Sequence, residues 1–382
     1  LSVKLSNKDF SDFFSLYNIS LYLYAFLFAL PAISTLRFYH HIFFKKLSRF
    51  AIDIFLISTI CIVLISFLFW IIGLDGYLDI LSVLVLSSGI GYFTFVANIY
   101  RSNEFLFSLL LFNILILILI LSFLYFGKNQ YDIRYLILNL GAIYWIVSLL
   151  SRFFIIKSHN FNQIFRLPSF KNIFENQLLL YSLPLAIVAL TNSLLGTSNQ
   201  IILRLFVSER ELAGYIAGYV ISEKILFSVQ SLIVFIFLPI IYKKFDDISS
   251  RAVSYIKKVS FFYLLFGLLI FPILLVYRDS IILTLSSEDL ITFSWIVPSL
   301  AIGLIFLGIS SLMSEVFLVA KDSVTVMKIY ILGFLINLIL NLSLIPPLGL
   351  IGAIISTTIS NLAILFLNIF FLYKLRGSKL KI

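Results

Sequence analysis

The chain has 382 residues, of which 61% are hydrophobic and only 12% charged, and its mean hydropathy is +1.10. So few charges cannot cover the surface of a water-soluble protein of this length. The formal net charge of +10 does not indicate nucleic-acid binding, because the basic residues are scattered over short segments instead of forming one patch. The composition therefore predicts an integral membrane protein.

Apolar runs recur along the whole chain, and each is long enough to cross a hydrocarbon core of about 30 Å as a helix. The predicted fold class is therefore an all-α polytopic membrane protein. A polar segment, residues 157–176, follows the fifth run. The eleven predicted spans are residues 13–36, 50–73, 77–100, 105–126, 135–156, 177–203, 212–242, 255–277, 291–320, 326–345 and 350–373.

Basic residues lie mainly on one side of this topology. Of the 28 Lys and Arg residues, 20 fall in one alternate set of loops and 7 in the other, while Lys224 lies within a span. Basic residues near span ends are retained in the cytoplasm, so the bias predicts a cytoplasmic C-terminus and a cytoplasmic 157–176 loop. With an odd number of spans Leu1 then lies outside. We expect one further helix upstream, which would give twelve in the intact protein.

Four charged residues are predicted to lie at membrane depth: Arg204, Glu223, Lys224 and Glu315. Charges at membrane depth are costly unless they are paired or hydrated, so such residues are candidates for a polar cavity. Arg204 can instead reach the headgroups from the outer end of its span. Glu223 and Lys224 either line a cavity or form ion pairs between helices. Glu315 follows a run of small residues suited to close packing, and either a structural hydrogen bond or a transport role fits it.

The span at 177–203 is unusually polar, because it holds Asn192, Asn199 and Gln200. It also contains Pro184 and Gly196, so we expect a broken helix. Broken helices at membrane depth occur chiefly where they are buried or line a cavity.

Sequence motifs of soluble enzymes are absent: there is no P-loop, HExxH, CxxC or GxSxG pattern. His40, His41 and His159 lie in or beside cytoplasmic loops without carboxylates at metal-ligand spacing. We therefore expect a transporter rather than an enzyme, with no cofactor and no metal site. Its energy would come from a gradient or from consumption of the substrate downstream.

Residues 337–353 read NLILNLSLIPPLGLIGA. Asn337 and Asn341 are one helical turn apart and lie on one face, where interhelical hydrogen bonds are expected. A turn at the outer surface and closely packed small residues should follow. The segment resembles the NxxLNxxLIPxxGxxGA pattern of Wzx-type O-antigen and polysaccharide flippases, a branch of the multidrug/oligosaccharidyl-lipid/polysaccharide (MOP) exporter superfamily.

Two further segments are similar to this family. Residues 199–203, with ELAGY at 211–215, look like its DRIIL segment and the later G-x-Y, although Asn199 and Gln200 stand where the family has Asp and Arg. Residues 9–39 look like its second helix and the basic loop after it. The resemblance thus covers nearly the whole chain except the first helix of the family.

The resemblance implies two six-helix bundles of MATE/MOP type around a central cavity that opens alternately to the two sides. Here these would be residues 1–156, without the first helix, and residues 177–373, joined by the cytoplasmic 157–176 loop and followed by a cytoplasmic tail, residues 374–382. The implied substrate is a polyprenyl-diphosphate-linked oligosaccharide, moved across the bacterial inner membrane. Implied partners are membrane lipids, the polysaccharide polymerase and the chain-length regulator, without nucleic acid.

We chose candidate site residues on charge and depth, because the family motifs prescribe none. A cationic side chain suits a diphosphate in a low-dielectric site. The candidates for this role are Lys224, Arg204 and Arg37. The candidates for lining the cavity or coupling transport to an ion are Glu223, Glu315, Asn192 and Asn199.

Two other functions compete with the flippase. A gradient-driven exporter of drugs or small molecules would share the fold and use an ionisable carboxylate, for which Glu223 and Glu315 are available. A membrane-embedded glycosyltransferase or polymerase would need a sizeable extramembrane loop, and no outer loop in this span map exceeds about 15 residues.

Overall fold

The computed structural model describes residues 7–28, 30, 77–102, 105–126, 133–158, 177–244, 250–320 and 322–379. Every secondary-structure element in these ranges is a helix. The chain forms two compact units, one of residues 1–11 and 191–382 and the other of residues 12–190. The expected boundary loop lies almost wholly outside the described residues, so the predicted domain limits remain a prediction.

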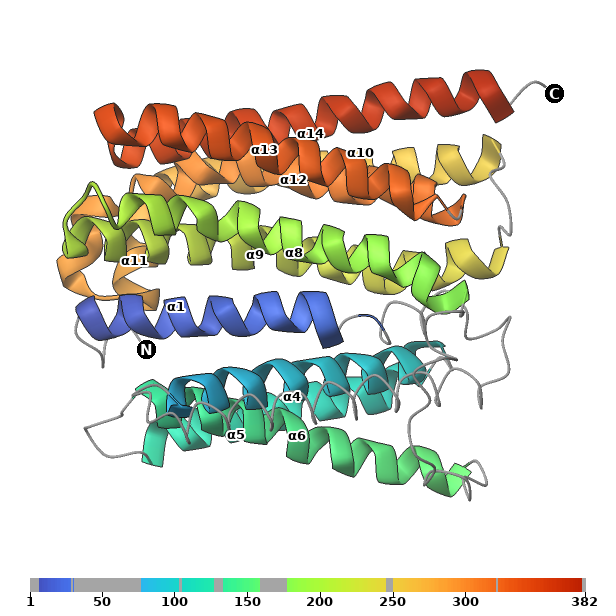
Figure 1. Cartoon of the computed structure of the whole chain (residues 1–382), viewed down its shortest axis with the longest axis horizontal. Helices are drawn as coiled ribbons and strands as arrows, with labels where there is room; N and C mark the ends of the chain where they lie inside the picture. The colour runs from blue at the N-terminus through green and yellow to red at the C-terminus, as the bar shows by residue number, and fades with distance from the viewer. Residues whose placement is uncertain are drawn as a thin grey trace. The chain divides into compact units, whose positions relative to one another are not determined.

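The helices coincide with the predicted spans over most of the described residues (Figure 1). The unit of residues 12–190 contains most of α1 (Asn7–Leu23), then η1 (Tyr24–Phe28), α4 (Tyr77–Ser102), α5 (Leu106–Phe126) and α6 (Ile133–Ser158). Helix α8 (Gln177–Leu203) contributes residues to both units. The other unit adds α9 (Glu209–Lys244), α10 (Ser250–Val276), α11 (Arg278–Leu285), η2 (Glu288–Phe293), α12 (Ile296–Val319), α13 (Ser323–Leu348) and α14 (Leu350–Lys379).

Eight of the described helices are long and apolar enough to cross a membrane. Their exposed residues are largely hydrophobic: on α10, for example, Phe262 is 66% and Leu269 72% exposed. A helix that shows such side chains on its outside needs an apolar solvent. The chain is therefore a multi-pass membrane protein. The span predicted at 50–73 lies outside the described residues.

Helices α4 and α6 pack backbone to backbone in the unit of residues 12–190. A Cβ added to Gly141 would lie 2.6 Å from the backbone nitrogen of Leu86, and one added to Gly89 would lie 2.7 Å from the carbonyl oxygen of Gly141. Separations this short leave no room for a side chain. Small residues are what allow membrane helices to approach so closely.

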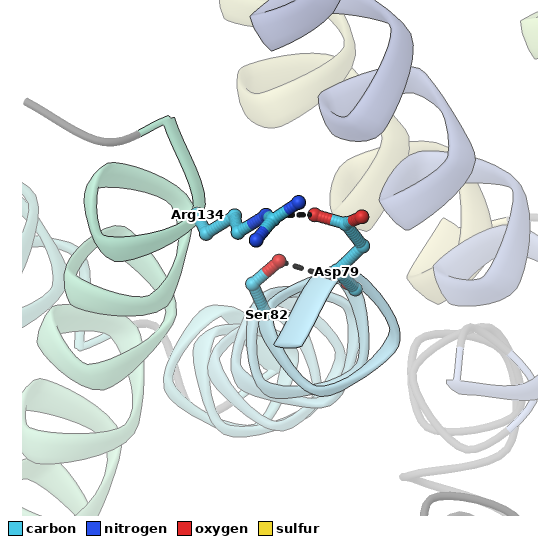
Figure 2. A network of polar contacts seen from close by, with 3 residues as sticks. All are labelled: Asp79, Ser82 and Arg134. Carbon is cyan, nitrogen blue, oxygen red and sulfur yellow. Dashed lines mark hydrogen bonds and ion pairs between the residues drawn. The ribbon is translucent and has the colours of Figure 1, made fainter. Parts of the chain in front are cut away.

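An ion pair joins the first turns of the same two helices (Figure 2). The Nε atom of Arg134 lies 2.7 Å from a carboxylate oxygen of Asp79, and the Ser82 hydroxyl donates to the Asp79 carbonyl at 2.8 Å. Both charged side chains are partly exposed, at 44% for Arg134 and 33% for Asp79. Such a pair contributes little energy by itself, so the close glycine contacts dominate the packing of α4 on α6.

The predicted proline-glycine turn is confirmed between α13 and α14, which lie side by side (Figure 1). Pro346 and Pro347 are in the last turn of α13, and Gly349 follows with φ +53°. Only a residue without a Cβ adopts this left-handed conformation readily. Close packing then begins at once, since a Cβ on Gly352 would overlap the carbonyl oxygen of Leu344.

The expected break in α8 is wrong, because residues 177–203 form one continuous helix with Pro184 inside it. Proline is tolerated in a membrane helix when neighbouring groups compensate for the lost backbone hydrogen bond. The glycine has a packing role instead. A Cβ on Gly196 would lie 2.6 Å from the hydroxyl of Tyr219 on α9, so the glycine allows the two helices to approach each other.

The helix expected at 291–320 begins later, because residues 288–293 form the 3₁₀ turn η2 and α12 starts at Ile296. The segment between α10 and α12 is thus folded into α11 and η2. It packs on the start of α9, where a Cβ on Gly214 would overlap the ring of Phe293. Arg210 adds a hydrogen bond of 2.9 Å to the carbonyl of Asp289.

Candidate functional site

A cluster of buried polar side chains, here called the asparagine cluster, connects four helices of the unit of residues 191–382. Each member is at most 8% exposed. The members are Ser198 and Asn199 on α8, Tyr215 on α9, Asn337 and Asn341 on α13, and Thr357 and Ser360 on α14.

Asn341 is the centre of this cluster. Its Nδ2 atom lies 2.8 Å from Asn337 Oδ1, 2.5 Å from Asn199 Oδ1 and 3.4 Å from Ser198 Oγ. A side-chain amide has two protons, so these three acceptors share two donors. Its own Oδ1 atom is buried and accepts no hydrogen bond from any described residue.

The other hydrogen bonds of the cluster connect neighbouring helices. The Nδ2 atom of Asn199 donates to the hydroxyl of Tyr215 at 2.8 Å and to that of Thr357. Asn337 accepts from Ser198 at 2.8 Å and donates to the hydroxyl of Ser360 at 3.1 Å. The interhelical hydrogen bonding predicted for Asn337 and Asn341 is therefore confirmed. All the groups are neutral, and together they hold α8, α9, α13 and α14 in register.

A second cluster of buried polar side chains joins α12 to α14 and consists of Ser310, Ser314 and Asn368. Asn368 donates to the hydroxyl of Ser310 at 2.6 Å and accepts from Ser314 at 2.9 Å. The neighbouring Glu315 is half-buried. The close packing predicted at the small residues before Glu315 is confirmed at Gly308, where an added Cβ would overlap the ring of Tyr263 on α10.

Glu315 also lines a small cavity that is otherwise apolar, with space of about the size of one water molecule. The cavity lies between α9, α10 and α12. The other lining residues are Ile233, Val234, Phe237, Ile241, Ile256, Val259 and Leu312.

Helix α9 carries the two charged residues predicted within its span, Glu223 and Lys224. Lys224 Nζ lies 3.7 Å from Glu223 Oε2, and the two side chains are 68% and 27% exposed. Side chains of adjacent helical residues diverge, so this contact requires both to bend toward each other. Sequence reasoning left open whether these residues would pair, and in the structure they pair with each other rather than with another helix.

Polar side chains continue from Lys224 along the same face, at helical spacings of four and seven residues. Ser228 and Ser231 are exposed, and they are followed by the exposed Leu232 and Ile236. We call these five residues the α9 strip. It runs from a cation through two hydroxyls to apolar side chains over twelve residues, or about 18 Å of helix.

The structure separates the predicted site residues into different places. Asn199 is buried in the asparagine cluster, while Asn192, seven residues earlier on α8, is exposed. Arg204 is exposed in the turn after α8. Glu315 is beside the cavity formed with residues 233–241 of α9, and Arg37 lies outside the described residues.

Sequence reasoning missed several polar residues that the structure groups with the predicted ones. The signal for Ser228 and Ser231 was their spacing from Lys224. Thr357 and Ser360 gave no local signal, because serine and threonine are common in membrane helices, whereas Asn368 is an asparagine within a predicted span and could have been singled out. Among the described residues no group of His, Cys, Asp or Glu is placed to hold a metal ion.

No protein-family model matches the sequence, and no curated protein matches it. Solved structures do match over nearly the whole chain. An outward-facing multidrug resistance MATE family transporter of the MOP superfamily has a TM-score of 0.64 at 15% identity, covering 98% of this chain and 88% of the other. The Vibrio cholerae MATE transporter VcmN has a TM-score of 0.65 at 16% identity, with 97% and 89% covered.

A third similar structure is a MOP superfamily transporter from Pyrococcus furiosus described as having a binding pocket of reverse polarity. Its TM-score is 0.65 at 14% identity, with 97% of this chain and 87% of the other covered. At such identities the likeness concerns the fold. The chain thus has the fold of MATE transporters of the MOP superfamily, as predicted.

Proposed function

We propose that the protein is a flippase that moves a polyprenyl-diphosphate-linked oligosaccharide from the cytoplasmic to the outer leaflet of the bacterial inner membrane. The observation that carries this proposal is the α9 strip. Lys224 is 15 residues from the first residue of α9 and 20 from the last, so about 22 Å and 30 Å of helix separate it from the ends.

A lysine on an exposed face in the middle of a membrane helix is unsuited to contact with lipid, whereas the Ser228 hydroxyl already donates to the carbonyl of Lys224. Burying a charge in hydrocarbon costs several kcal/mol unless the charge is paired or hydrated. The α9 strip therefore faces a polar pathway. A lysine ammonium in such a pathway would bind a diphosphate through charge-assisted hydrogen bonds.

The order of residues along the strip fits an amphiphile. The diphosphate would contact Lys224, hydroxyl groups of the substrate would meet Ser228 and Ser231, and the isoprenoid chain would lie on Leu232 and Ile236. The resemblance of residues 337–353 to the polysaccharide branch supports the same class of substrate. Arg204, at the outer end of α8, and Arg37 are further candidates for contact with phosphate.

In this proposal the cycle is alternating access between residues 1–156 and 177–373. The asparagine cluster keeps the outer part of α8 fixed to α9, α13 and α14 while the pathway opens. The C-terminus would be cytoplasmic, and the products would pass to a polymerase and its chain-length regulator.

The proposal is tested by mass spectrometry of the polyprenyl-linked sugar pool in the native bacterium after deletion of the gene. Accumulation of single, unpolymerised repeat units, reversed by the wild-type gene, would support a flippase. Lys224→Ala should remain in the membrane yet fail to reverse the accumulation. An unchanged pool with intact surface polysaccharide would refute the proposal.

A gradient-driven exporter of small molecules is the second candidate. It is favoured by Glu315, the only polar residue lining the cavity between α9, α10 and α12 in the part of the chain that is described. Drug efflux that depends on a proton or sodium gradient, and that is lost in Glu315→Gln while the sugar pool stays normal, would establish this function instead.

A further inference from the structure

Lys224 already has an anionic partner on its own helix. Glu223 Oε2 lies 3.7 Å from its Nζ atom, and no other ion pair of Lys224 occurs among the described residues. The two side chains differ in exposure, with Glu223 the less exposed at 27% against 68%. The ammonium is therefore the more accessible of the two charges, and the carboxylate lies within reach of it.

We propose that the Glu223 carboxylate competes with an anionic lipid headgroup for the ammonium of Lys224. The headgroup displaces the carboxylate on binding, and the carboxylate displaces the headgroup on release. This inference rests on the proposed function, because it takes Lys224 as the diphosphate-binding residue. The role of Glu223 is to set how tightly the site holds its substrate.

Charge explains why such a competitor is useful to a transporter. A diphosphate and a lysine in a low-dielectric pathway attract each other strongly, and a site that binds too tightly releases slowly. A carboxylate within reach of the same ammonium opposes binding and offers the ammonium a replacement partner when the headgroup leaves. The pair is on one helix at adjacent positions, so the exchange needs only side-chain rotation.

The geometry also separates this role from a structural one. An ion pair with a structural role connects two helices, as the pair of Asp79 and Arg134 does. Glu223 and Lys224 are neighbours in sequence, so their contact adds no connection between helices. Removing the carboxylate should therefore leave the stability of the protein unchanged.

The test is calorimetric titration of the purified full chain in lipid nanodiscs with farnesyl diphosphate, a short polyprenyl diphosphate, with farnesol as the neutral counterpart. Glu223→Gln should lower the Kd for farnesyl diphosphate about three- to tenfold, because the competing charge is gone while the shape is kept. Lys224→Ala should raise the Kd by at least about tenfold. Farnesol binding should be the same in both variants.

Two controls assign the effect to the Glu223–Lys224 pair. Glu288→Gln removes one exposed negative charge in η2 and should leave the Kd unchanged. The double variant Glu223→Gln/Lys224→Ala should bind like Lys224→Ala, because Glu223 acts through the lysine. Tighter binding in the double variant than in Lys224→Ala would overturn the proposal, since Glu223 would then act without Lys224.

The outcomes distinguish this inference from the function it rests on. If Lys224→Ala loses binding but Glu223→Gln binds no tighter than wild type, the competitor role is wrong and the diphosphate site stands. If Lys224→Ala binds farnesyl diphosphate normally, the proposed site itself is wrong. In transport, Glu223→Gln should show a lower KM and a lower maximal rate, because release has become slower.

Discussion

At the scale of single residues, Asn341 makes its side-chain hydrogen bonds entirely inside the asparagine cluster. It is fully buried and donates to Asn199, Asn337 and Ser198 from one amide nitrogen. These acceptors have no access to water, so each relies on partners inside the cluster. Loss of a partner from a buried polar group costs more than the hydrogen bond gained on folding.

We expect Asn341→Leu, which keeps the side-chain volume, to destabilise the protein by about 1–3 kcal/mol because it leaves buried acceptors unsatisfied. The measurement is the thermal midpoint of the purified protein in detergent. Asn192→Leu, an exposed position on α8, is the control and should leave the midpoint within error. An unchanged midpoint for Asn341→Leu would show that the cluster does not stabilise the bundle.

At the scale of elements, the closest described helix packing in the unit of residues 12–190 is that of α4 with α6. It depends on glycines that face backbone atoms, and backbone atoms cannot rotate away as a side chain does. The ion pair between Arg134 and Asp79 closes one end of this helix pair (Figure 2).

Gly141→Ala should therefore force α4 and α6 apart. We expect a loss of about 1–3 kcal/mol of stability from overpacking, measured as a lower thermal midpoint or a smaller yield of folded protein. Ile146→Ala, on the same helix at a position that is 52% exposed, should have little effect. Equal behaviour of the two variants would indicate that the helices can separate without cost.

At the scale of the whole molecule, the distribution of Lys and Arg orients the chain. The turn between α8 and α9 should be outside and the start of α10 inside. Both places offer exposed positions for labelling, Glu209 and Ser254. The only cysteine of the chain, Cys61, can be replaced first so that single introduced cysteines report alone.

In a Cys61→Ser background, a membrane-impermeant thiol reagent should label Glu209→Cys in intact spheroplasts. It should label Ser254→Cys only after the membrane is made permeable. The readout is the mass shift of the protein on a gel. The reverse pattern would show that the orientation is inverted, and the C-terminus would then be outside.

The sequence by itself determined the membrane fold, the limits of most described helices and the turn at Gly349. Hydropathy fixes these features because a helix in lipid must satisfy its backbone internally and present apolar side chains over about 20 residues. The same argument singled out Lys224, Glu223 and Asn341, since polar groups at membrane depth are conspicuous.

Only the tertiary structure decided what those residues contact. Sequence reasoning expected α8 to break, whereas Gly196 is needed for the approach of Tyr219 and the helix continues. It left the partner of Lys224 open, and the structure gives Glu223. Thr357 and Ser360 joined the asparagine cluster without any local signal, and Asn368, a polar residue at membrane depth, was not singled out. Side-chain partners depend on which faces of distant helices meet. The hydropathy pattern along the sequence indicates how deep in the membrane a residue lies, but it does not indicate which residues of other helices surround it.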